Sequence, residues 1–542
     1  MRALFALVAL TVGCGGSSSQ IGPVRFANQP VIWKVDDRRD VAKPPESRAY
    51  YRASYYVESF YGLAKRGLRL ERDRRALGVN AVDEVPDSTW FTNRKNLSPD
   101  DIRRGPLPDT PEHHMPWTIK SGKSGGKEVG FIAEDARGAK FVLKLDPPAR
   151  PEVETAADAI VARLLWAAGW NAASDHVVYF TRADLSIAPG AEIEIAGRKR
   201  PIDPKFLEDT LDALAHSAGG AVRGVASMYI TGTPVGGAPR VGTRHDDPND
   251  LVPHERRRDL RGLAVFFAWL SHADVKEDNT VDAWQPDRAN PEIHYVVHYL
   301  IDFGWALGAA AAATDDPSID YRYGLDFKET FLSIGSLGIR REVWESRKKP
   351  TLRGIGVFGV DDYHPDAWKP TMPSMFSVMQ ADRFDKLWAA KILIRMTREQ
   401  LAAAVDAGRL TDAVSAKYML DTLVARQRIT AAYWFRRAAP LDDLTVADGR
   451  FCFTDLALHY QLEAATTIFT IRAFDTSGHA IATTSVPAAA DGRACTRDLP
   501  MAPGRDRYTI YRIESSRGTP PMLVHIANDP AGTARIIGVH RL

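Results

Sequence analysis

Apolar residues recur at helical spacing through the middle of the chain. They form one stripe in 151–168, which ends at Gly169, and one face in 254–270. The segment 381–436 is predicted to form three more helices. Three short apolar runs precede the first of these helices and are typical of strands, because glycine or turn residues bound them. These runs are 117–120, 128–134 and 140–145. The pattern predicts a small β-rich part followed by a helical one.

The pattern changes near residue 440, where apolar and polar residues begin to alternate. The runs 466–474 and 479–486 flank a turn sequence and predict a hairpin. Further alternating runs lie at 507–513, 522–526 and 535–540. Short strands at this density predict a β-sandwich-like domain over 440–542. The predicted fold class is therefore α+β, with more than one domain in the 542 residues.

Composition narrows the class of protein. Hydrophobic residues make up 45% of the chain and charged residues 25%, which are ordinary values for a globular protein. The net charge of +2 is too small for a polyelectrolyte, so nucleic acid is not an implied partner.

The first 14 residues resemble a bacterial lipoprotein signal. Arg2 supplies a positive start, 3–12 is an apolar run too short to span a bilayer, and Thr11-Val-Gly-Cys14 resembles a lipobox. Thr11 departs from the usual leucine. Residues 15–20 form a flexible tether. The resemblance implies lipidation of Cys14 and a membrane anchor in the cell envelope, at the outer membrane or the periplasmic face; the alternative is an ordinary cleaved signal.

Two cysteines remain beyond the signal, Cys452 and Cys495, and both lie in the alternating segment. An even pair in an exported chain predicts one disulfide.

Two short motifs carry the candidate chemistry. The helix 254–270 runs into His272-Ala-Asp-Val-Lys-Glu-Asp-Asn279, and an apolar strand leads into Asp302-Phe-Gly304. The first matches the pattern H-x-D-x-K-x-x-N and the second is D-F-G, so this part of the chain resembles a divergent, atypical protein kinase. The interval between the motifs is long for that family, and 285–292 is predicted to be a hairpin tip that absorbs it.

The resemblance gives each motif residue a role. Asp274 would accept the proton of the attacking hydroxyl and Lys276 would reach the transferring phosphate, with His272 in the same catalytic set. Asn279 and Asp302 would be oxygen ligands for Mg²⁺ or Mn²⁺. The purely structural alternative is a polar loop after a helix for the first motif and a turn at a strand end for Asp-Phe-Gly.

The predicted strands before the first helix resemble a kinase small lobe. Gly122, Lys123, Gly125 and Gly126 lie in a glycine-rich loop that would approach nucleotide phosphates, although the loop is neither G-x-G-x-x-G nor a Walker A motif. A plain hairpin turn is the alternative. Lys144 in Phe-Val-Leu-Lys resembles the strand lysine of the family, which binds nucleotide phosphates.

A kinase-like site needs an acid that pairs with Lys144. The helix 151–168 offers two: Asp158 sits where the family's acid usually lies, and Glu154 has the longer reach but sits in the first turn. The sequence leaves the choice open.

The predicted organisation is a signal (1–14), a tether (15–20), an N-terminal extension (21–115), a small lobe (116–235), a helical large lobe (236–437) and the β domain. The implied function is transfer of phosphate, or of a nucleotidyl group, from ATP or another nucleotide. The acceptor would be a protein, a small molecule or a glycan. The alternative function is a non-catalytic, kinase-fold envelope lipoprotein that serves as a binding or adhesion module.

Overall fold

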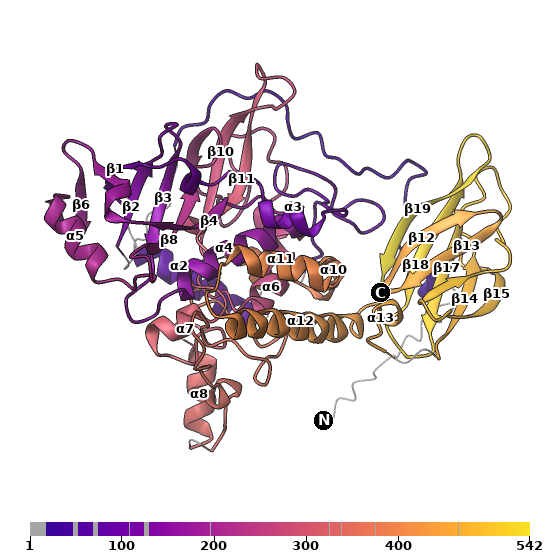
Figure 1. The fold of residues 1–542 in the computed structure, drawn as a ribbon. Helices are drawn as coiled ribbons and strands as arrows, with labels where there is room; N and C mark the ends of the chain where they lie inside the picture. The colour runs from indigo at the N-terminus through magenta and orange to yellow at the C-terminus, as the bar shows by residue number, and fades with distance from the viewer. Residues whose placement is uncertain are drawn as a thin grey trace, which may run out of the picture. The chain divides into compact units, whose positions relative to one another are not determined.

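A computed structural model gives the fold of the chain. The structure describes residues 18–46, 53–68, 74–107, 109–123, 129–195, 197–324, 326–337, 339–373, 375–463 and 466–542. The chain forms two compact units. The larger holds 33–79 and 85–434; the smaller holds 435–542 together with the N-terminal pieces up to residue 32 and 80–84. Figure 1 shows the elements of both units.

The larger unit begins with a six-stranded sheet in the order β4-β8-β3-β2-β1-β5. Its strands are β1 (Trp117–Gly122), β2 (Gly130–Glu134), β3 (Lys140–Leu145), β4 (Asp175–Phe180), β5 (Leu185–Ile187) and β8 (Val222–Met228). Every pair of neighbouring strands is antiparallel except the pair of β1 and β5, which is parallel. Large apolar side chains, including Trp117, Phe131 and Phe141, form the core beside the sheet. The smaller elements around it are β6 (Glu192–Ile195), β7 (Arg198–Pro201) and α5 (Pro204–Asp212).

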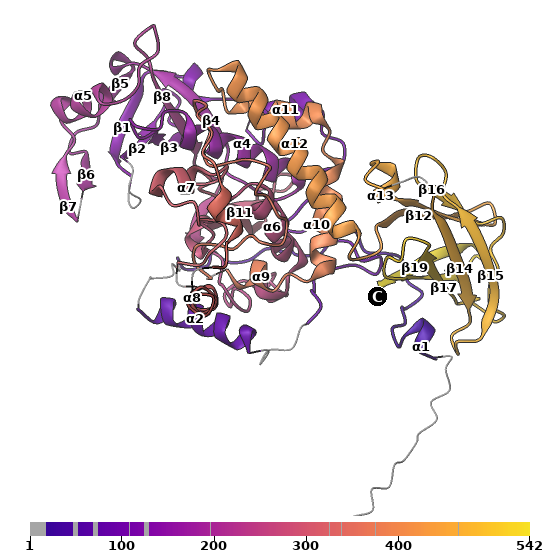
Figure 2. The same cartoon turned by 90° about the horizontal axis from the view of Figure 1, so that it is seen from below.

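Helix α4 (Val153–Ala168) lies between this sheet and α11 (Arg398–Ala407), as Figures 1 and 2 show. It is buried along almost its whole length. Asp146, just after β3, caps its first turn, since its carboxylate accepts hydrogen bonds from the backbone N–H groups of Glu154 and Thr155 at 3.0 Å each. The buried carboxylate therefore fixes the angle at which α4 leaves the sheet.

The helical part is built on α6 (Arg258–Trp269) and α10 (Arg383–Arg395). Gly262 allows the two helices to approach, because a Cβ there would lie 2.6 Å from the ring of Trp388. Asp385 of α10 is fully buried and accepts hydrogen bonds from Arg258 Nε at 3.1 Å and Arg261 Nη1 at 3.4 Å. The buried positive charges of α6 are thus paired with a buried negative charge of α10.

The remaining elements of the larger unit connect these parts. They are α2 (Ala53–Gly67), α3 (Pro99–Arg104), η1 (Pro111–His113), β9 (Thr233–Gly236), η3 (His254–Arg256), η4 (Glu277–Asn279), β10 (Thr280–Pro286), β11 (His294–Leu300), α7 (Ala309–Thr314), α8 (Phe327–Gly335), η5 (Val343–Ser346), α9 (Phe376–Met379) and α12 (Ala413–Phe435). The long helix predicted before the H-x-D-x-K-x-x-N motif is split into η3 and α6. The tip of the β10–β11 hairpin is 287–293.

The smaller unit contains two antiparallel sheets around one apolar core. One sheet is β12 (Leu441–Ala447), β13 (Arg450–Asp455) and β16 (Arg493–Cys495). The other, in the order β15-β14-β17-β18-β19, holds β14 (Ile468–Phe474), β15 (Ala480–Pro487), β17 (Thr509–Ser515), β18 (Met522–Asn528) and β19 (Ala534–Arg541). Phe453 and Phe469 meet between the sheets with their ring centroids 4.9 Å apart. This arrangement supports a sandwich-like class.

Two short N-terminal pieces complete the smaller unit. Helix α1 (Ser18–Ile21) packs beside β17, and residues 80–84 reach β19, where Val539 donates its N–H to Ala81 O at 2.8 Å. The sequence pattern predicted these residues to belong to the tether and the N-terminal extension. Their place in this unit depends on tertiary contacts that no local pattern encodes.

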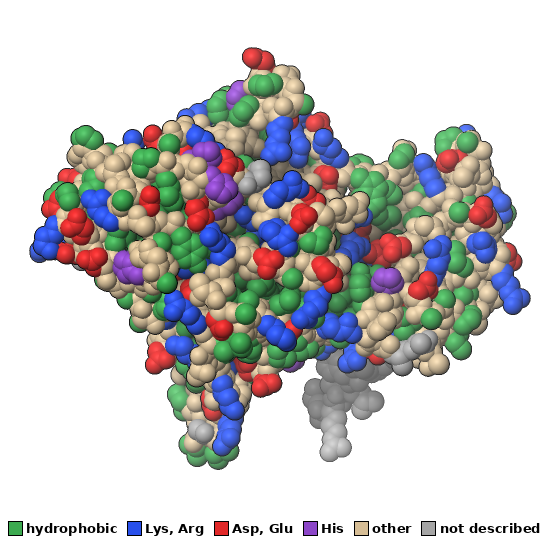
Figure 3. Space-filling view, viewed as in Figure 1, with side chains coloured by type: hydrophobic (Ala, Val, Ile, Leu, Met, Phe, Trp, Pro, Cys, Tyr) green, Lys and Arg blue, Asp and Glu red, His purple; other side chains and the backbone are tan. Residues whose placement is uncertain are grey.

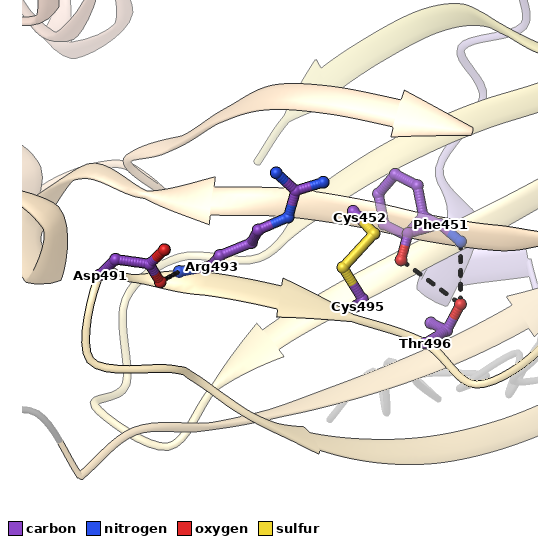
Figure 4. The surroundings of a disulfide bond; sticks show 6 residues. All are labelled: Phe451, Cys452, Asp491, Arg493, Cys495 and Thr496. Carbon is purple, nitrogen blue, oxygen red and sulfur yellow. Dashed lines mark hydrogen bonds between the residues drawn. A yellow bond between two sulfur atoms is a disulfide. The ribbon is translucent and has the colours of Figure 1, made fainter. Parts of the chain in front are cut away.

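A disulfide joins Cys452 to Cys495 and bridges β13 and β16 (Figure 4). The two residues lie opposite one another in the strand register. Beside them Thr496 donates its N–H to Phe451 O at 2.9 Å and accepts the Phe451 N–H on its hydroxyl at 3.0 Å. The predicted pairing is confirmed.

We expect loss of this disulfide to lower the free energy of unfolding of the smaller unit by about 2–4 kcal/mol, because the bond restricts the unfolded chain. Urea unfolding of wild type and of Cys452→Ala with Cys495→Ala would measure the difference. Mass spectrometry of the non-reduced protein should find the two peptides linked. Two free thiols in that material would contradict the prediction.

No membrane-crossing helix is present in the described stretches, where every helix is too short or too polar.

Candidate functional site

Lys144 of β3 is held between two carboxylates that come from distant parts of the larger unit. Its Nζ lies 3.0 Å from Asp158 Oδ2 on α4 and 2.8 Å from Asp302 Oδ1, which follows β11. Asp158 also accepts the backbone N–H of Phe303 at 2.7 Å. The side chain of Lys144 is 18% exposed and that of Asp302 is 51% exposed, so the cluster opens to solvent on the Asp302 side.

The structure decides which acid pairs with Lys144. Asp158 makes the contact, whereas Glu154 lies one turn earlier with its carboxylate 3.6 Å from Arg150. The predicted place of Glu154 in the nucleotide site is therefore not supported. Because Asp146 draws the first turn of α4 onto the end of β3, only the next turn faces Lys144.

Opposite charges shift the pKa values of this cluster strongly. Burial alone would lower the pKa of Lys144, but the carboxylates of Asp158, Asp302 and Asp175 outweigh it and raise that pKa well above its usual value. The charge of Lys144 holds the pKa of Asp302 well below its usual value, and Lys123 and Lys276 act in the same direction. Lys144 is thus a cation and Asp302 an anion throughout the neutral range.

The motif from His272 to Asn279 folds onto itself. Lys276 Nζ binds both carboxylate oxygens of Asp274, at 2.8 and 3.0 Å, and Asn279 donates its Nδ2 to Asp274 O at 2.6 Å. The start of the loop is fixed by Arg426 of α12, which donates to Ser271 Oγ at 2.8 Å. Hydrogen bonds therefore hold the backbone of the loop at both ends, before Asp274 through Ser271 and after Lys276 through Asn279.

The β10–β11 hairpin brings the two motifs together. Its strands pair from Thr280 opposite Leu300 outward to Pro286 opposite His294, and Ile301 donates its N–H to Asn279 O at 3.0 Å. Asn279 therefore lies opposite Ile301, the residue directly before Asp302. The long interval between the motifs forms this hairpin and does not separate the two residues.

His272 lies behind the site and does not face it. It is buried, and its ring packs edge-on against Phe267 and Phe303 at centroid distances of 5.1 and 5.9 Å. Burial lowers the pKa of His272 to about 4, so the ring is neutral at pH 7. Its assignment to the catalytic set is corrected: the ring positions the loop against the Asp-Phe-Gly segment.

The glycine-rich loop is described only at its ends. Gly122 packs against β6, where a Cβ would lie 2.3 Å from the side chain of Ile193. Lys123 donates its N–H to Gly130 O at 2.8 Å. After Lys144, its positive charge adds to the lowering of the pKa of Asp302. Gly125 and Gly126 lie outside the described residues, as does Cys14.

The residues near Asp302 fit a magnesium or manganese ion that also binds nucleotide phosphates. Within the part of the chain that the structure describes, no group of three or more His, Cys, Asp or Glu side chains forms a metal cluster. Mg²⁺ in nucleotide sites commonly takes one or two protein oxygens, with phosphates and water completing its shell. Asp302 has an exposed carboxylate, and Asn279, whose Nδ2 is used within the loop, has an amide oxygen to offer.

Asp175 joins this cluster, although no sequence motif includes it. It begins β4 opposite Ser227 of β8, and Lys144 lies opposite Val225 two residues away. Lys144 and Asp175 therefore face the same side of the sheet. Burial raises the pKa of Asp175 to about 7, and the carboxylate of Asp158 adds to the rise. The only signal in the sequence was an aspartate at the start of the apolar run that ends at Phe180.

We expect Asp175 to make stability fall as the pH rises from 3.8 to about 7. In that window the unfolded carboxyl has lost its proton while the folded one keeps it, which costs up to about 4 kcal/mol. Asp175→Asn should flatten the pH dependence of the urea midpoint across this window. The exposed Asp209→Asn is the control and should retain the wild-type slope. Equal slopes in wild type and Asp175→Asn would contradict the assignment.

Comparisons with known proteins add little. Neither a protein-family model nor a curated protein matches the chain. Among solved structures it is similar to the Rio2 kinase–ADP/Mg²⁺–phosphoaspartate complex from Chaetomium thermophilum, at 16% identity and a TM-score of 0.19, over 54% of this chain and 71% of that one. At this TM-score the likeness adds nothing to the arrangement above, which comes from the chain's own geometry.

Proposed function

We propose that the larger unit is a phosphotransferase of the atypical kinase type, which transfers phosphate or a nucleotidyl group from ATP or another nucleotide. The observation that carries the proposal is the position of Lys144 between Asp158 and Asp302. A strand lysine, a helix acid and the aspartate of Asp-Phe-Gly are the parts that bind phosphates and metal in this chemistry.

Each residue of the site has a separate role in the proposal. Lys144 binds the nucleotide phosphates and Asp158 orients it. Asp302 and Asn279 hold Mg²⁺ or Mn²⁺, which when bound neutralises charge on the phosphates. Asp274 accepts the proton of the attacking hydroxyl, and Lys276, which is already 2.8 Å from Asp274, contacts the transferring group.

The test is metal-dependent nucleotide binding by residues 18–542. Isothermal titration with ATP in the presence of Mg²⁺ or Mn²⁺ should show binding that disappears in EDTA and in Lys144→Met. Binding without transfer would favour the second candidate, a kinase-fold binding module in the envelope. Absence of binding with either metal, in protein that unfolds cooperatively, would refute the phosphotransferase.

We also propose that the chain is anchored in the bacterial cell envelope through lipid on Cys14, with its acceptor, a protein, small molecule or glycan, outside the cytoplasm. The proposal comes from the lipobox-like sequence alone. In cells, Cys14→Ser should move the protein from the membrane fraction to the soluble fraction or block its processing. Wild-type protein that is soluble and begins beyond Cys14 would contradict the anchor.

A further inference from the structure

The segment 327–343 exposes an unusual density of large apolar side chains. Among the described residues 21 large hydrophobic side chains are exposed, and seven of them fall in this short segment. They are Phe327, Phe331, Leu332, Ile334, Leu337, Ile339 and Val343. The most exposed are Leu337 at 88% and Ile339 at 83%. Exposed apolar clusters of this kind mark interaction sites on soluble proteins.

Helix α8 presents this face outward because its inward face is polar. Glu329 is buried and accepts hydrogen bonds from Arg340 Nη1 at 2.5 Å and from Lys369 Nζ at 3.3 Å. Asp326, at the N-cap, binds the same lysine at 2.7 Å. Phe327, Phe331 and Ile334 follow helical spacing on the exposed side. Ion pairs therefore dock the helix. Its apolar stripe contacts α2 only at its start, where the ring centroids of Phe327 and Phe60 lie 6.4 Å apart, and Phe331 and Ile334 stay exposed.

The segment projects from the larger unit as a convex end. In Figure 1 α8 forms a protrusion, and in Figure 3 hydrophobic side chains cover its tip while Lys and Arg side chains line one flank. Exposed basic residues of this stretch are Lys328, Arg341, Lys348 and Lys349. An apolar tip beside exposed cations is typical of protein segments that enter the interface of an anionic bilayer.

We infer that 327–349 is a membrane-contact element, whose apolar tip (Phe331, Ile334, Leu337 and Ile339) enters the headgroup region of an anionic lipid surface. A second copy of the chain fits this surface less well, because a two-fold interface would bring the same cations together. A bilayer, unlike a peptide, needs no groove to receive a convex apolar end. The inference does not depend on phosphoryl transfer or on lipid at Cys14.

The test uses residues 18–542, which retain every described residue and lack Cys14. The protein should co-sediment with vesicles of equal parts phosphatidylcholine and phosphatidylglycerol, and far less with pure phosphatidylcholine. Leu337→Asp with Ile339→Asp should weaken the binding about tenfold or more. Neutralising Arg341, Lys348 and Lys349 with glutamine should weaken it about fivefold per charge.

The matched control is Leu251→Asp with Val414→Asp, at positions that are 66% and 63% exposed and outside the segment. It should bind vesicles like wild type. All variants should retain the wild-type circular dichroism and thermal midpoint, because the changed side chains are exposed. Equal binding by the tip variant, or no binding by wild type, would overturn the inference. A wild-type dimer in sedimentation velocity that the tip variant abolishes would assign the face to a second copy.

Discussion

Asp302→Asn is expected to abolish most of the metal-dependent nucleotide binding. Even loss of a hydrogen-bond partner behind a metal ligand commonly costs about 10–100-fold in metal affinity, and this change removes a proposed ligand charge itself. It also removes the anion that lies 2.8 Å from Lys144, which leaves Asp158 as the remaining close partner of that cation. Titration of ATP with Mg²⁺ into wild type and the variant measures the effect.

Asp274→Asn is expected to separate nucleotide binding from phosphate transfer. Nucleotide affinity should stay within about twofold, while phosphate release from ATP should fall about 10²–10⁴-fold, the usual range for loss of a general base. Asp278→Asn is the control, since it removes an exposed carboxylate from the same loop without touching a proposed role. If Asp278→Asn lowers phosphate release as much as Asp274→Asn does, Asp274 acts through its charge alone and not as the general base.

Asp385→Ala is expected to have the largest effect on stability, with a free energy of unfolding lower by about 3–5 kcal/mol. The change leaves Arg258 and Arg261 buried without the carboxylate that lies between α6 and α10. Thermal or urea unfolding of the larger unit would measure it. Because α6 leads directly into the loop that holds His272 and Asp274, nucleotide binding should weaken as well.

The control for Asp385 is Asp421→Ala on α12. Asp421 pairs with Arg398 and Lys417 at the surface, where such pairs contribute about 0–1 kcal/mol. A loss at Asp385 no larger than at Asp421 would mean that water or rearrangement replaces the buried carboxylate.

The parts of the site that the sequence predicted are those encoded over short distances. The strand with Lys144, the helix with Asp158 and the loop from His272 to Asn279 each follow from a local pattern. The choice between Asp158 and Glu154 could not follow, because both lie on the buried α4 and only the cap at Asp146 decides which turn meets the strand.

Long-range packing explains the rest. The position of Asp175 beside Lys144 requires knowledge that β4 and β3 flank β8, and no local pattern gives a strand order. Likewise 80–84 joins the smaller unit through a backbone hydrogen bond to β19, more than four hundred residues away along the chain. The outward apolar face of α8 also follows an ordinary amphipathic pattern, and its reversal depends on the ion pairs of Glu329.

The β10–β11 hairpin has a consequence for finding similar proteins. Because its ladder sets Asn279 beside Ile301 whatever happens at the tip, the number of residues between the two motifs carries no information about the site. Insertions or deletions confined to 287–293 would leave both ends of the hairpin in place. The loss of two residues from each strand would do the same, because the side chains that remain keep their faces of the sheet. A search that fixes the distance between H-x-D-x-K-x-x-N and D-F-G would therefore miss relatives whose hairpin has a different length. A search that pairs the motifs through two alternating apolar runs would find them.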